Sequence, residues 1–97
     1  MLSLVKLALR ITTTAFDDEL NLLIAAAVKD LGIAGVNDNG SEIAVGTTDS
    51  LLKMAIVTYV KMHFGAPEDF ARLERSYNEQ KAQLQVATGY TDWNLEE

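Results

Sequence analysis

The chain has 97 residues, 48% of them hydrophobic and 23% charged, so it can form one domain with a small core but not two. It contains no cysteine, which excludes a disulfide scaffold, a thiolate zinc site and thiol catalysis. The formal net charge of −6 argues against a free-standing nucleic-acid-binding protein, which needs a basic face.

The first predicted element is a short helix over residues 3–11, with Ser3 as its N-cap. Lys6 and Arg10 are four residues apart and therefore share one side of this helix. They form either a solvated edge, which is the commoner case, or a small basic strip that faces an acidic partner. They also interrupt the apolar start, so no signal peptide is predicted. The apolar face has the spacing i, i+3, i+4, i+7 and consists of Leu4, Leu7, Ala8 and Ile11.

A second helix is predicted over residues 15–31. Thr14 begins a shortened capping box before it, and Gly32 is the expected stop after it. Ala25 and Ala26 leave a smooth surface that another helix could approach closely. The core-facing side is a continuous apolar stripe of Leu20, Leu23, Ile24, Ala27, Val28 and Leu31.

Residues 33–48 are predicted to form a long loop. Asn39-Gly40 is a turn signal, and residues 42–45 are a possible short strand. Loops of this length in small domains are usually functional or mobile. The loop also carries four apolar side chains that need a packing partner, namely Ile33, Val36, Ile43 and Val45.

The third predicted helix covers residues 49–64, from the N-cap Asp49 to the stop at Gly65. Apolar side chains cover nearly its whole circumference, which is typical of a helix buried on all sides. Three other helices in so small a domain can hardly surround it. We therefore expect part of its surface to meet another subunit.

A fourth helix is predicted over residues 67–88, with Pro67 at its first position. Its apolar side has a heptad-like spacing, interrupted by Gln80, and consists of Phe70, Leu73, Tyr77, Leu84 and Ala87. Gly89 ends the helix, and the residues after it form a tail. The aromatic tail either folds back onto its own core or serves as an anchor peptide on a neighbouring protein.

No residue pattern predicts catalysis, a metal site or a cofactor. His63 is the only histidine and has no second ligand at metal-site spacing. Asp17, Asp18 and Glu19 point about 100° apart on a helix, so they complement the helix dipole instead of converging. The segment 37–40 fails the calcium-loop pattern at both ends. We therefore expect that the protein is not an enzyme.

Four segments occur in a characteristic order. They are LVKLALRI at 4–11, DDELNLLIAAA at 17–27, the apolar stretch 49–64, and SYNEQKAQL at 76–84 followed by ATGY at 87–90. In this order they resemble the head–tail connector proteins of tailed phages, also called head-completion or DNA-packaging adaptor proteins.

The resemblance implies a structural role in the virion, at the head–tail junction, after a period in the host cytoplasm. Such proteins form a closed ring of about a dozen copies beneath the portal protein. The ring extends the DNA channel without sequence-specific DNA binding and docks later head-completion or tail proteins. An acidic chain suits a channel through which DNA must slide. No membrane partner and no cofactor are expected.

We thus expect an all-α, four-helix bundle-like domain over residues 1–97, with a helical body at 1–88 and a docking tail at 89–97. The expected anchor to the portal or a neighbour consists of Tyr90, Trp93 and Leu95. The expected ring interface consists of Ala25, Ala26, Leu52, Ile56 and Tyr59. The alternative is a small helical adaptor or antirepressor-like regulatory dimer of phage origin. A dimer needs one two-fold contact, whereas a ring needs two distinct faces.

Overall fold

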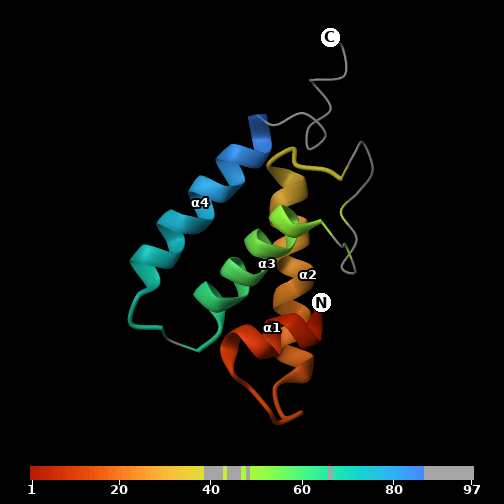
Figure 1. Ribbon diagram of the computed structural model, residues 1–97, viewed down its shortest axis with the longest axis vertical. Coiled ribbons are helices and arrows are strands. Elements are labelled where there is room, and N and C mark those ends of the chain that lie inside the picture. Colours follow the sequence, from red (N-terminus) through yellow and green to blue (C-terminus); the bar gives the residue numbers. More distant parts are fainter. Residues whose placement is uncertain (39–42, 44–46, 48, 66, 87–97) are drawn as a thin grey trace.

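The computed structural model describes residues 1–38, 43, 47, 49–65 and 67–86. These residues contain four helices and confirm the all-α prediction (Figure 1). The helices, in chain order, are α1 (Leu2–Leu9), α2 (Asp17–Ile33), α3 (Ser50–His63) and α4 (Phe70–Val86).

The third helix is the centre of the fold. α3 packs against α2 on one side and α4 on the other, while α1 lies across both α2 and α3 (Figure 1). The apolar stripe predicted for α2 faces the core, because a stripe at a 3.6-residue spacing lies on one side of a helix. The apolar face predicted for α1 is wrong: the buried residue of α1 is Val5, whereas Leu4 and Leu7 are 37% and 76% exposed. The side chains with no exposed surface are Val5, Leu20, Ala27, Leu31, Leu52, Ala55, Ile56 and Val60.

The capping residues predicted for the first two helices are wrong. α1 begins after Met1 instead of Ser3, and α2 begins after Phe16; neither cap makes a side-chain hydrogen bond. The prediction for α3 is confirmed, because the carboxylate of Asp49 accepts hydrogen bonds from the backbone N–H groups of Leu51 and Leu52 at 3.0 and 3.1 Å.

The helix stop predicted at Gly32 is also wrong, since α2 runs on through Gly32 to Ile33. The chain turns at Gly35, which has a φ of 90°. There the N–H of Gly35 donates to the carbonyl of Gly32, and that of Val36 to the carbonyl of Leu31. This pair of bonds is the Schellman arrangement, which favours glycine at the left-handed position.

Two of the four apolar loop residues have core positions. Val36 and Ile43 are buried, whereas Ile33 is 77% exposed and Val45 lies outside the described residues. Most of the possible strand at 42–45 also lies outside them. The hydroxyl of Thr47 donates a hydrogen bond of 3.1 Å to Asp38, which ties the end of the loop to its beginning.

The fourth helix begins later than predicted. α4 starts at Phe70, three residues after Pro67, and its first turn is held by an ion pair between Asp69 and Arg72. On its predicted apolar side, Leu73, Tyr77 and Leu84 are buried, whereas Phe70 is 41% exposed and Ala87 lies outside the described residues. The described part of the chain ends at Val86, so the predicted helix end at Thr88 and the tail lie outside it.

Candidate functional site

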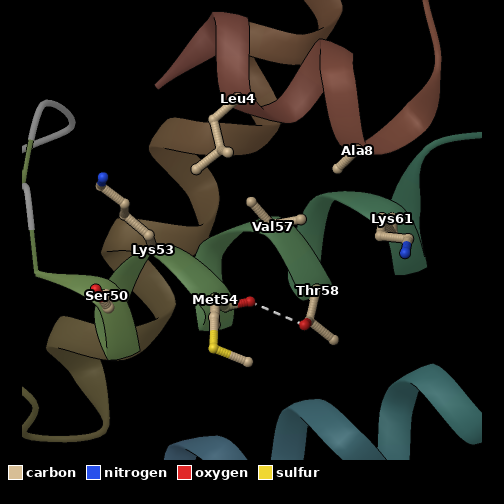
Figure 2. A pocket seen from close by; sticks show the side chains of 8 residues that line it. All are labelled: Leu4, Ala8, Ser50, Lys53, Met54, Val57, Thr58 and Lys61. Atoms are coloured by element: carbon tan, nitrogen blue, oxygen red, sulfur yellow. Dashed lines mark hydrogen bonds between the residues drawn. The ribbon is translucent and has the colours of Figure 1, made fainter.

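An open hollow of about 380 Å³ lies between α1 and α3 (Figure 2). Leu4 and Ala8 reach toward it from α1, where they are one helical turn apart. Met54 and Val57 line it from α3. The hollow therefore has an apolar floor built by two helices that lie far apart in the sequence.

Two lysines line the opposite ends of the hollow. Lys53 and Lys61 both belong to α3 and are eight residues apart, which corresponds to about 12 Å along the helix (Figure 2). Neither has an ion-pair partner among the residues that the structure describes. No acidic residue lines the hollow within the same part of the chain. We call this surface the α1–α3 hollow.

The apolar floor is open to solvent. Met54 is 56% exposed and Leu4 is 37% exposed, and Leu7 and Leu51 are also exposed, each within three residues of a lining residue. Exposed apolar side chains around a hollow are typical of an interaction site. The chemistry of the hollow therefore suits an apolar partner surface with negative charge at its edge.

A second exposed apolar surface lies on α2. The buried residues of α2 recur at Leu20, Ile24, Ala27 and Leu31, so the residues about half a turn away lie on the side remote from the core. Leu22 and Ile33 on that side are 69% and 77% exposed. We call this surface the outer α2 stripe; it consists of Asp18, Leu22, Ala25, Ala26, Lys29 and Ile33.

The structure separates the predicted ring-interface residues into two groups. Ala25 is exposed and Ala26 partly exposed, so both offer surface to a neighbour. Leu52 and Ile56 have no exposed surface and fill the core, which corrects the expectation that they meet another subunit. α1 and α4 each cover a part of the α3 surface. The apolar side of α3 that stays exposed is the one that carries Met54.

Tyr59 is half-buried within the monomer. Its ring lies 4.3 Å from the ring of His63 and 5.4 Å from that of Tyr77, centroid to centroid. His63 also lies 6.4 Å from the ring of Phe70. These rings form an aromatic cluster that joins α3 to α4. The arrangement explains the one histidine as a packing residue.

The sequence left a basic strip of Lys6 and Arg10 open as the less common alternative to a solvated edge, and the described contacts do not support that strip. The ammonium group of Lys6 pairs with the carboxylate of Asp17 at 2.9 Å. Arg10 lies beyond the end of α1 in a left-handed conformation, with φ 60° and ψ 41°. The two side chains therefore do not share a helix face, which is a correction to the sequence analysis.

The described residues contain no group of three or more metal-binding side chains placed to hold an ion. They also include no helix that is both long and apolar enough to cross a membrane. The predicted anchor residues Tyr90, Trp93 and Leu95 lie outside the described residues.

Sequence reasoning missed Lys53, Met54 and Lys61 as candidate contact residues. A signal was available, because Met54, Val57 and Lys61 have the spacing of one helix face. That spacing does not reveal where α1 crosses α3, and the position of this crossing decides which part of the α3 surface stays exposed to solvent.

Exposed apolar side chains on α1, α2 and α3 are available for contact with other proteins. A family model described as "Phage connector protein" matches residues 1–91. The chain belongs to the phage connector protein family. This confirms the resemblance to head–tail connector proteins and gives the protein the role of a phage structural connector. No curated protein and no solved structure matches the connector.

Proposed function

We propose that this connector assembles as a ring below the portal protein at the head–tail junction of the virion. The ring would extend the channel through which packaged DNA passes, without sequence-specific binding, and would present a surface to later head-completion or tail proteins. No bond is made or broken in this role. Before assembly, the subunits would be located in the host cytoplasm.

One observation carries the ring proposal. The monomer has two exposed apolar surfaces of different composition, the α1–α3 hollow and the outer α2 stripe. A two-fold dimer uses the same patch on both copies, whereas a ring joins two different patches around a closed rotation. Two unlike surfaces therefore favour a ring over the regulatory dimer.

The aromatic tail at 89–97 is the proposed anchor to the portal or to a neighbouring ring. It contains Tyr90, Trp93 and Leu95, and aromatic side chains of this kind are common interface hot spots. Deletion of residues 89–97 should abolish portal association and leave the far-ultraviolet circular dichroism unchanged. Portal association at full strength after this deletion would overturn the anchor.

Mass measurement by light scattering tests the function as a whole. The purified protein is measured alone and mixed with the portal protein encoded in the same phage genome. A ring-sized species, or a portal complex that carries about a dozen copies, supports the connector ring. A stable dimer that ignores the portal contradicts it and favours the antirepressor-like regulator. A lone monomer that ignores the portal also contradicts it.

A further inference from the structure

We infer that the α1–α3 hollow of one subunit receives the outer α2 stripe of a second copy of this chain. The inference rests on the proposed ring and goes beyond it, because it states which two surfaces meet and in which direction. It is argued below from apolar fit, from charge and from spacing along the two helices.

The apolar parts of the two surfaces complement each other. The hollow is open above Leu4, Met54 and Val57 and has a volume of about 380 Å³. Leu22 is a large apolar side chain of the outer α2 stripe, one helical turn after Asp18, and is 69% exposed. The alanines that follow it, Ala25 and Ala26, have no bulk that would hold a second helix away. Leu22 can therefore enter the hollow while α2 lies close to α3.

The charges are also complementary. The hollow has Lys53 and Lys61 at its ends, and neither is paired among the described residues. Asp18 and Glu19 are exposed in the first turn of α2, one turn before Leu22. Opposite charges at the edge of an apolar contact favour one register and disfavour others. The pairing thus favours a contact in which the first turn of α2 lies over one end of the hollow.

Spacing along the helices agrees with this register. Asp18 and Leu22 are four residues, or about 6 Å, apart along α2, and Val57 is equally far from Lys53 and from Lys61 along α3. An acid opposite one lysine therefore places Leu22 over the middle of the hollow.

The contact is heterologous, because the two surfaces lie on different sides of one subunit. α1 and α3 both pack against α2 (Figure 1). The outer α2 stripe lies about half a helical turn away from the buried residues of α2, on the side remote from the core. A copy that donates its stripe to one neighbour still has a free hollow for the next. Repetition of this contact gives a ring if the rotation closes.

Cysteine cross-linking tests the contact, since the natural chain contains no cysteine. The full-length double variant Leu22→Cys/Met54→Cys is oxidised under mild conditions. We expect a ladder of dimers, trimers and larger species. Each single variant alone should give no cross-link, and an equal mixture of the two single variants should stop at a dimer. A matched control, Leu22→Cys/Val86→Cys, uses another exposed residue on α4 and should give no ladder.

Several results would overturn the inference. Dimers from Met54→Cys alone would mean that the hollow forms a two-fold contact. A ladder of equal yield from the control would mean that random collision produces the cross-links. If light scattering shows a ring while the double variant remains uncross-linked, the docking inference fails and the proposed function survives. If no assembly forms with or without the portal, both fail.

Charge reversal gives a second readout that does not depend on cysteine chemistry. Lys53→Glu/Lys61→Glu should raise the concentration for half-assembly about tenfold or more. Adding Asp18→Lys/Glu19→Lys to the same chain should restore assembly. Arg75→Glu, an exposed site on α4, is the control and should leave assembly unchanged. Loss of assembly without rescue by the second pair would contradict the proposed charge pairing.

Discussion

The hydroxyl of Tyr77 on α4 donates a 2.5 Å hydrogen bond to a carboxylate oxygen of Asp30 on α2. The ammonium group of Lys81 reaches the same oxygen at 3.3 Å and lies 5.1 Å from the centre of the Tyr77 ring. Because α4 packs chiefly against α3, these polar contacts attach the fourth helix to the second. The amide of Gln85 adds a 2.9 Å bond to the carbonyl of Ala34.

Replacing Tyr77 with phenylalanine should lower the free energy of unfolding by about 2 kcal/mol, because a hydrogen bond to a charged group is lost at a partly buried site. Urea unfolding measures the change. Tyr59→Phe is the matched control, since the Tyr59 hydroxyl makes no hydrogen bond among the described residues; its effect should stay below about 0.5 kcal/mol. Equal losses in the two variants would contradict the role given to the Tyr77 hydroxyl.

Alkaline pH should destabilise the fold through the same tyrosine. Burial raises the pKa of Tyr77 strongly, and the hydrogen bond to Asp30 adds to the increase. Burial and Asp30 also raise the pKa of Tyr59. At high pH the folded state therefore keeps protons that the unfolded state has released, so stability is fully present below about pH 10 and falls above it.

Each such tyrosine contributes a slope of about 1.4 kcal/mol per pH unit once the pH exceeds the unfolded pKa. Urea unfolding between about pH 9 and pH 11 measures the slope in the natural protein and in Tyr77→Phe. The variant should lose less stability over this range than the natural protein. Parallel curves would show that Tyr77 does not carry the dependence.

Glycine at position 10 should stabilise the protein by up to about 1 kcal/mol. Arg10 has a left-handed backbone at the end of α1, where the N–H of Ile11 bonds the carbonyl of Lys6. Glycine adopts this conformation without the Cβ clash that other residues suffer. Thermal unfolding of Arg10→Gly and Arg10→Ala separates the backbone effect from loss of the side chain. A gain in Arg10→Ala as large as in Arg10→Gly would assign the effect to the charge.

Ile56→Ala and Met54→Ala should have opposite consequences, although the residues are two positions apart on α3. Ile56 has no exposed surface, so its truncation should cost about 2–5 kcal/mol of stability. Met54 is exposed, so its truncation should cost less than about 0.5 kcal/mol while it weakens assembly. Denaturant unfolding and light scattering report the two effects separately. Normal assembly in Met54→Ala would argue against the hollow as a contact surface.

The sequence predicted the helices well because a buried stripe imposes a local 3.6-residue period. All four expected helices are present, and the stripe of α2 from Leu20 to Leu31 faces the core as expected. Helix ends were less predictable. Several residues near Ser3, Thr14 and Gly32 can serve as a cap or a stop, and tertiary packing selects among them. Asp49 was predictable because its carboxylate meets two free N–H groups of its own helix turn.

The amino-acid sequence by itself determined the all-α class, the apolar stripe of α2 and, through the order of its segments, the phage connector family. The tertiary structure alone decided which apolar residues of α3 stay open. Leu52 and Ile56 are enclosed in the core, whereas Met54 stays exposed in the hollow beside the crossing of α1 over α3. That crossing depends on packing between residues some fifty positions apart, which local periodicity does not encode.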